Sequence, residues 1–329
     1  MAKRQEILGL FPADIRRVFD RVSGDFDQIQ EIRLRAGQPV LIRWDNREYG
    51  ITEEGETGPV ESLASPFLVA GGQIRETAEF LGHFSLYAAE EELKQGFMTV
   101  RGGHRVGVAG TVSLMDGRVR IMKSISCLNI RIAHQVPGCA DSLLPLVYPA
   151  EGEFYNTLII SPPGCGKTTL LRDLIRQISD GSKDGRRPGL NVGVADERSE
   201  LGASFQGIPQ KDLGIRTDIL DGCPKSQGLM MLIRSMSPQV VAADEIGGQA
   251  DMEALAAAGN CGCRILASVH GSSLEEIREK RELAGLLEDG LFKRLVFLDR
   301  DGGVGHIRAV LGRRVRKGEV VWENCWELF

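Results

Sequence analysis

Residues 157–180 follow the order strand, glycine-rich loop, helix, which is the arrangement that binds nucleotide phosphates. An apolar strand at Thr157–Ile160 leads into Ser161–Thr168, and the helix that follows places leucine and isoleucine on one face. Gly164 and Gly166 let the backbone approach a phosphate closely, and a helix N-terminus attracts anions. We expect nucleotide binding by this phosphate loop, which comprises Ser161, Pro162, Pro163, Gly164, Cys165, Gly166, Lys167, Thr168 and Thr169.

Two side chains give the phosphate loop its chemistry. Lys167 is expected to reach the β- and γ-phosphates of ATP as a point charge, and the hydroxyl of Thr168 is a ligand for Mg²⁺. Position 161 is serine where the usual pattern begins with glycine, and serine fits a backbone that needs no positive φ. The alternative is a Gly-Lys-Thr turn that arises by chance. Cys165 is expected to be a neutral filler rather than a redox switch.

Carboxylates follow a second apolar strand. Pro238–Ala243 is apolar and is followed by Asp244 and Glu245. Because the carboxyl ends of parallel strands meet at one edge of a doubly wound sheet, these acids are expected beside the phosphate loop. Asp244 would hold Mg²⁺ through water, and Glu245 would orient or activate the attacking water. The alternative is a strand that ends in acids by chance.

Two further strands end in polar side chains. Leu190–Ala195 precedes Asp196 and Glu197. Glu197 is a second candidate base and Asp196 a further candidate for the Mg²⁺ shell, and the alternative is a solvated charged loop. Arg264–Ser268 leads to His270, which falls where a γ-phosphate could be sensed. A lone histidine is more often structural, which is the alternative for His270.

The alternation of strands and helices predicts an α/β fold with a parallel sheet over residues 151–329. Taken together with the phosphate loop and the acids at the strand ends, it leads us to expect a RecA-like P-loop ATPase core there. Its last part differs, because three short strands there are separated only by glycine-bearing turns. They are expected to form an antiparallel meander over Lys293–Leu298, Gly305–Leu311 and Glu319–Trp322.

A smaller α+β domain is expected over residues 1–134, joined to the ATPase core by a linker over residues 135–150. Its pattern includes a helix at 75–92 and separate strands at 118–121 and 126–133.

Composition excludes several classes of protein. The chain has 329 residues and a net charge of -5, and basic and acidic residues are evenly spread, so no region favours bulk nucleic acid or a membrane surface. No apolar run approaches the roughly 18 residues that span a bilayer, and the first residues lack a signal peptide's apolar core. Seven scattered cysteines argue against a disulfide framework, and the pair at 261 and 263 lacks the further ligands of structural zinc. We expect a soluble, cytoplasmic protein.

The order of these motifs resembles the type II/IV secretion ATPases and pilus motors, in which a phosphate loop, an acidic box, an Asp-Glu strand and a histidine box follow one another. Within that group the chain is most similar to the stage III sporulation protein AA family of endospore-forming bacteria, and the resemblance covers nearly the whole chain. The segments that carry it are Arg33–Gly37, Val194–Glu200, Arg216–Lys225, Ala243–Gly247 and Trp322–Asn324.

The resemblance implies an ATPase on the mother-cell side that energises a channel or secretion apparatus between mother cell and forespore. It implies a homo-oligomer, a hexameric ring with ATP and Mg²⁺ between subunits, associated peripherally with membrane-embedded channel proteins. Ring ATPases place arginines from a neighbouring subunit at the γ-phosphate. Arg216 is the first candidate, ahead of Arg234, Arg33 and Arg35, and an ordinary salt bridge is the alternative for each.

The sequence departs from the secretion ATPases at one motif position, since those enzymes usually have glycine where this chain has Asp244. Two other functions stay open. The chain could be a nucleic-acid-dependent ATPase of the same core, although the even charge gives no reason to expect a stable nucleic-acid partner. It could also be an ATP-binding scaffold without significant turnover, against which the acids at Glu197 and Glu245 argue.

Overall fold

The computed structural model describes residues 2–82, 96–115, 118–148 and 153–326. The chain divides into two compact units, one formed by Met1–His134 with Ala203–Gln210 and the other by Gln135–Gly202 with Lys211–Phe329. The described part of the predicted linker, residues 135–148, groups with the second unit. Its last two residues, 149 and 150, lie outside the described residues.

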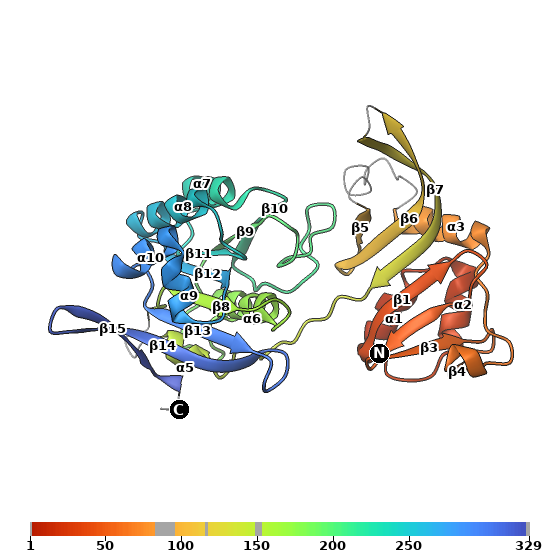
Figure 1. Cartoon of the computed structure of the whole chain (residues 1–329), viewed down its shortest axis with the longest axis horizontal. Helices are drawn as coiled ribbons and strands as arrows, with labels where there is room; N and C mark the ends of the chain where they lie inside the picture. Colours follow the sequence, from red (N-terminus) through yellow and green to blue (C-terminus); the bar gives the residue numbers. More distant parts are fainter. Residues whose placement is uncertain (1, 83–95, 116–117, 149–152, 327–329) are drawn as a thin grey trace. The chain divides into compact units, whose positions relative to one another are not determined.

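The first unit is an antiparallel sheet with short helices, in the strand order β4-β3-β2-β1-β7-β6-β5 (Figure 1). Alternating side chains of β1 and β7 enter one core, as Ile32 and Ile130 show by being fully buried and paired across the two strands. Its elements are α1 (Ala2–Leu8), α2 (Ala13–Arg21), β1 (Ile29–Arg35), β2 (Leu41–Trp44), β3 (Arg47–Ile51), β4 (Thr57–Gly58), α3 (Gly71–Leu81), β5 (Phe97–Val100), β6 (His104–Met115) and β7 (Arg118–Arg131).

Two expectations for the first unit differ from the structure. The strands predicted at 118–121 and 126–133 are one continuous strand, β7, because β6 pairs along its length and absorbs the irregular pattern in register shifts. The helix predicted over 75–92 begins earlier, at Gly71, and is described to Leu81. Residues 83–92 of that prediction lie outside the described residues.

The second unit is one sheet in the order β10-β9-β11-β12-β8-β13-β14-β15. The strands from β10 to β13 are parallel, and β14 and β15 add the predicted antiparallel meander to the same sheet. The strands are β8 (Thr157–Ser161), β9 (Val192–Asp196), β10 (Thr217–Asp221), β11 (Val240–Ala243), β12 (Arg264–His270), β13 (Arg294–Asp299), β14 (His306–Arg316) and β15 (Glu319–Asn324). The helices are α5 (Leu144–Val147), α6 (Lys167–Asp180), α7 (Lys225–Met236), α8 (Gln249–Asn260), α9 (Leu274–Glu279) and α10 (Arg281–Glu288).

Helices cover both faces of this sheet, because its central strands are apolar on both sides. All residues of β8, β9 and β11 are buried. Helix α6 packs its leucine and isoleucine stripe on one face, and α7, α8 and α10 pack on the other (Figure 1). This arrangement fixes the carboxyl ends of the parallel strands at one edge.

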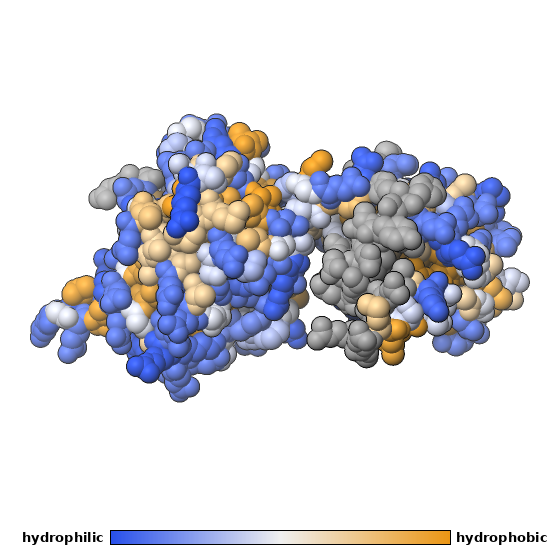
Figure 2. Space-filling view, turned by 90° about the horizontal axis from the view of Figure 1, so that it is seen from above, coloured by the Kyte–Doolittle hydropathy of each residue, from blue (hydrophilic) through white to orange (hydrophobic). Residues whose placement is uncertain are grey.

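A groove between α7 and α8 interrupts the polar surface of the second unit. Figure 2, which looks down on these helices, shows moderately hydrophobic residues gathered there. Met230, Met231, Ala250 and Ala254 are among the residues that line the groove, and Met231 is exposed.

Candidate nucleotide-binding site

The phosphate loop joins β8 to α6, and two glycines in the left-handed region shape it. Gly164 has φ +72° and Gly166 has φ +91°, values that residues with a Cβ rarely adopt. A Cβ on Gly166 would also lie 2.9 Å from the backbone nitrogen of Gly305. Gly166 is the N-cap residue of α6, so the helix begins at Lys167 with its amides directed at the loop.

The other residues of the phosphate loop support its shape. Ser161 is the last residue of β8, fully buried, and its hydroxyl donates a 2.7 Å hydrogen bond to the carbonyl of Pro162. Cys165 is buried in the core beneath α6. The carbonyl of Pro163 accepts a hydrogen bond from Arg300, a residue that the sequence reasoning did not single out. Thr169 lies in the first turn of α6.

The strand order gathers the polar residues at one edge. β11 lies between β9 and β12, and β12 lies beside β8, all in parallel register. The ends of these four strands therefore bring Asp196, Asp244, His270 and the phosphate loop to the same edge of the sheet. The sequence could predict the edge, but which strands are neighbours is a property of the folded sheet.

Lys167 and Thr168 both contact Asp244. The Lys167 ammonium lies 2.8 Å from Asp244 Oδ1 and 3.2 Å from Glu245 Oε1, and the Thr168 hydroxyl donates a 2.6 Å hydrogen bond to Asp244 Oδ2. Burial alone would raise the pKa of Asp244, but the Lys167 ammonium and the surrounding hydrogen bonds hold that pKa below its usual value. Asp244 is therefore ionised at neutral pH, as a metal ligand must be.

Ser268 connects these groups and was missed by the sequence reasoning. Its fully buried hydroxyl donates to Asp244 Oδ1 and accepts from the Lys167 ammonium at 3.2 Å and from the Glu245 amide at 2.9 Å. It lies two residues before His270 on β12, and the pairing of β12 with β11 brings it beside Asp244. A hydroxyl two residues before the end of a strand is the only signal the sequence carried.

Glu245 contacts three basic side chains. Its Oε1 lies 2.9 Å from His270 Nε2 and 3.2 Å from Lys167, and its Oε2 accepts a 2.8 Å hydrogen bond from Arg198. The backbone of Glu245 has φ +53°, a conformation that costs a residue with a side chain free energy and persists where the surroundings impose it. The sequence reasoning predicted Glu245 and His270 here and did not single out Arg198.

Asp196 and Glu197 are engaged with other partners. Both oxygens of Asp196 accept backbone amides, from Glu200 on one side and from Leu201 and Gly202 on the other, each at 2.9 Å. Burial raises the pKa of Asp196, and these amide hydrogen bonds offset part of that rise. Glu197 forms an ion pair with Lys225 at the start of α7. Both acids line a small cleft with Asp244 and Glu245.

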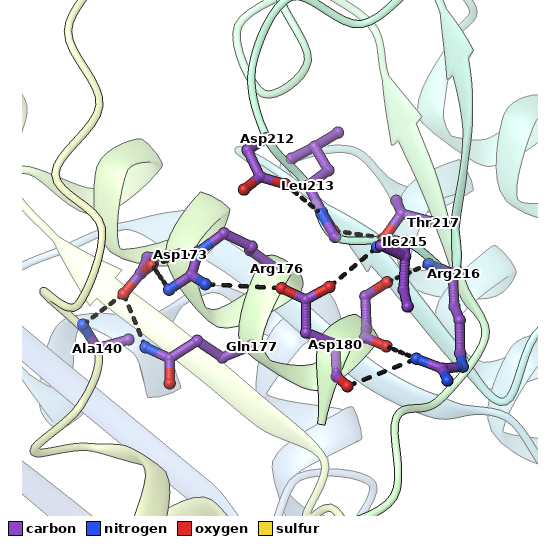
Figure 3. A network of polar contacts seen from close by, with 12 residues as sticks. Ala140, Asp173, Arg176, Gln177, Asp180, Asp212, Leu213, Ile215, Arg216 and Thr217 are labelled. Atoms are coloured by element: carbon purple, nitrogen blue, oxygen red, sulfur yellow. Dashed lines mark hydrogen bonds and ion pairs between the residues drawn. The ribbon is translucent and has the colours of Figure 1, made fainter. Parts of the chain in front are cut away.

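Arg216 lies far from the phosphate loop of its own chain. Its guanidinium donates a 2.9 Å hydrogen bond to the carbonyl of Ser179, and its amide donates to the Ser179 hydroxyl at 2.7 Å, so it binds the last turn of α6 (Figure 3). Helix α6 has 14 residues, which separates this end from the phosphate loop by about 20 Å. Asp180 and Arg176 extend the same network.

In the described part of the chain, His, Cys, Asp and Glu side chains nowhere form a group of three or more that could hold a metal ion. Thr168 and Asp244 offer hard oxygen donors, which fit a Mg²⁺ ion that takes its other ligands from water and phosphate. Across the same described ranges, every helix is too short or too polar to cross a membrane.

Comparison with known proteins identifies the family. A family model described as "Sporulation stage III, protein AA" matches residues 1–321. The stage III sporulation protein AA of Bacillus subtilis (strain 168) is 40% identical over 307 residues, which covers 93% of this chain and 94% of that protein. The chain belongs to the sporulation stage III protein AA family.

Two solved structures are similar to this family member in fold. The Legionella pneumophila ATPase DotB is similar with a TM-score of 0.52 and 15% identity, covering 91% of this chain and 76% of that chain. The pilus retraction motor PilT with bound ADP is similar with a TM-score of 0.52 and 15% identity, covering 90% of this chain and 78% of that chain. The likeness shows the fold alone. It confirms the predicted α/β class with a RecA-like core.

Proposed function

We propose that this member of the sporulation stage III protein AA family binds ATP with Mg²⁺ and hydrolyses it. One observation carries the proposal: Lys167 and Thr168 of the phosphate loop both contact Asp244, while Glu245 lies beside them at the end of β11. This arrangement supplies a phosphate-binding cation, oxygen ligands for Mg²⁺ and a carboxylate base within one cluster.

Each side chain has a distinct part in the proposed reaction. Lys167 and the amides of the phosphate loop bind the phosphates and stabilise the charge that develops during in-line attack by water. Thr168 and Asp244 would hold Mg²⁺, which neutralises phosphate charge when bound. Glu245 accepts the proton of the attacking water, and His270, 2.9 Å from it, orients its carboxylate.

The proposed cellular role is based on the family to which the chain belongs. We propose a hexameric ring that energises a channel or secretion apparatus between mother cell and forespore, bound to membrane-embedded channel proteins from the cytoplasmic side. Membership of a sporulation family and an ATPase fold support this role. Arg216, which is turned away from its own phosphate loop, would act on a neighbouring subunit.

Two variants test the ATPase proposal. Lys167→Ala removes the cation that faces the phosphates and should weaken ATP binding about 10- to 100-fold. Glu245→Gln keeps the side-chain shape but removes the base, so it should bind ATP and hydrolyse it at least about 100-fold more slowly. Calorimetry measures binding, and phosphate release measures turnover.

Lys183→Ala is the matched control, because Lys183 is exposed in the loop after α6 and should leave both quantities at the parent level. If Glu245→Gln turns over like the parent, Glu245 is not the base, and Glu197→Gln becomes the next variant to measure. If the parent itself binds no ATP, the proposal fails.

A further inference from the structure

Arg198 contacts the candidate base although the motif reasoning gave it no role. It lies in the loop after β9, two residues beyond Asp196, and its Nη1 donates a 2.8 Å hydrogen bond to Glu245 Oε2. Two hydrogen bonds hold the backbone of this loop in place. The amide of Glu200 donates to Asp196, and the hydroxyl of Ser199 donates to Asp221. The Arg198 side chain itself is 67% exposed. It can therefore change partner without disturbing the core.

Three basic side chains from three strand ends converge on one carboxylate. Lys167 follows β8, Arg198 follows β9 and His270 ends β12, and all three contact Glu245. Lys167 and His270 lie on Oε1, and Arg198 lies on Oε2. Arg198 is thus separated from the phosphate-binding lysine by the width of a carboxylate group. Three basic side chains are more than one carboxylate needs. They are better suited to a phosphate group, which carries more charge and more oxygens.

We propose that Arg198 binds the γ-phosphate of ATP within its own chain and makes the site prefer ATP to ADP. The inference rests on the proposed ATPase function. A guanidinium forks onto phosphate oxygens, and a γ-phosphate beside Lys167 offers it a stronger partner than Glu245. When Arg198 moves to the phosphate, Glu245 is released to act on water. In the ADP complex, Arg198 keeps its contact with Glu245.

The ion pair alone does not account for Arg198. An exposed arginine gains little stability from a carboxylate, because water screens the charges. Replacing Arg198 should therefore change the free energy of unfolding only slightly. An effect of the replacement on nucleotide affinity can be measured separately from that change. If Arg198 binds the γ-phosphate, its substitution lowers the affinity for ATP and not that for ADP, whereas a structural role would affect both nucleotides alike.

The test compares affinities for ATP and ADP in the presence of Mg²⁺, measured by calorimetry in a Glu245→Gln background so that ATP persists. Arg198→Ala should weaken ATP binding about 10- to 100-fold and leave ADP binding within about twofold. Arg198→Lys should recover part of the loss, since it restores the charge but not the fork. Arg186→Ala is the matched control, because Arg186 is 85% exposed and forms an ion pair with Asp184 in its own loop.

A second background separates binding from an effect through Glu245. In Glu245→Ala, Arg198 has lost its carboxylate partner, so a loss of ATP affinity caused by Arg198→Ala must come from the phosphate. If that loss disappears in Glu245→Ala, Arg198 acts only through Glu245 and the inference is overturned. Equal losses for ATP and ADP overturn it as well. A parent that binds neither nucleotide refutes the ATPase proposal itself, which is a separate result.

Discussion

Ser268 gives the most local prediction outside the recognised motifs. Its buried hydroxyl contacts Asp244, Lys167 and the amide of Glu245 at once. Ser268→Ala leaves these buried groups with one partner fewer, which costs about 1–3 kcal/mol. We expect turnover to fall about tenfold and more Mg²⁺ to be required for half-maximal activity, because Asp244 loses the hydrogen bond that orients it.

Turnover measured over a Mg²⁺ titration checks this expectation. Ser235→Ala is a matched control, since Ser235 is exposed and its hydroxyl donates a hydrogen bond within α7, to the carbonyl of Met231. Unchanged Mg²⁺ dependence in Ser268→Ala would mean that Thr168 and Lys167 orient Asp244 without help.

The candidate site divides into residues that a sequence reveals and residues that it does not. Lys167 and Thr168 belong to a continuous motif whose local geometry its own glycines determine, so their neighbourhood could be predicted. Asp244 and Glu245 could be assigned to the same edge by the strand-end rule. Ser268 and Arg198 could not, because their contacts depend on β12 and β9 flanking β11, which no local pattern encodes.

The turn between β13 and β14 supports the phosphate loop from outside. Arg300 donates a 3.0 Å hydrogen bond to the carbonyl of Pro163, and the amide of Gly305 donates a 2.8 Å hydrogen bond to the carbonyl of Cys165. In a trans peptide the C=O and the following N–H point in opposite directions. Holding these two carbonyls against the turn therefore directs the amides of Gly164 and Gly166 away from it.

Arg300→Ala should loosen this support. We expect weaker binding of ATP, ADP and inorganic pyrophosphate by a similar factor of about 3–10, because the amides of the phosphate loop serve all three. Calorimetry with each ligand makes the comparison, and Arg314→Ala on β14 is the control, since Arg314 is 72% exposed and lies in a pair with Glu323. A loss for ATP and ADP that spares pyrophosphate would contradict the prediction and make Arg300 a contact for the nucleoside.

The elements themselves differ in how clearly the sequence marks them. β8 and β11 are short apolar runs, buried on both faces, and were predicted within a residue or two. β10 was missed. It is an edge strand with one neighbour and is only partly buried, so its sequence, Thr217–Asp221, mixes polar and apolar residues and lacks a continuous apolar run. The terminal meander was predicted as such. Its attachment to β8 through β13 depends on parallel pairing between distant segments.

Assembly is the part of the proposal that depends on more than one chain. Lys167, Glu245 and Arg198 all come from one unit of one chain. Arg216 is about 20 Å away at the other end of α6, so it can reach a γ-phosphate only in another copy. A ring in which sites are completed by neighbours thus predicts that turnover per chain rises with protein concentration as the oligomer forms.

Mixing variants tests the same arrangement directly. Arg216→Ala keeps an intact phosphate loop, and Lys167→Ala keeps an intact Arg216. Each variant alone should be nearly inactive, and a mixture should regain part of the parent turnover, because some interfaces then combine the sound loop of one chain with the arginine of the other. Mass in solution and melting temperature are measured alongside, since Arg216 also binds the end of α6 and its loss could unfold the chain. Two outcomes would contradict a role of Arg216 in the reaction. One is a folded, oligomeric mixture that regains no turnover, and the other is a parent whose turnover per chain is the same as monomer and as oligomer. In either case each chain would hydrolyse ATP with its own residues.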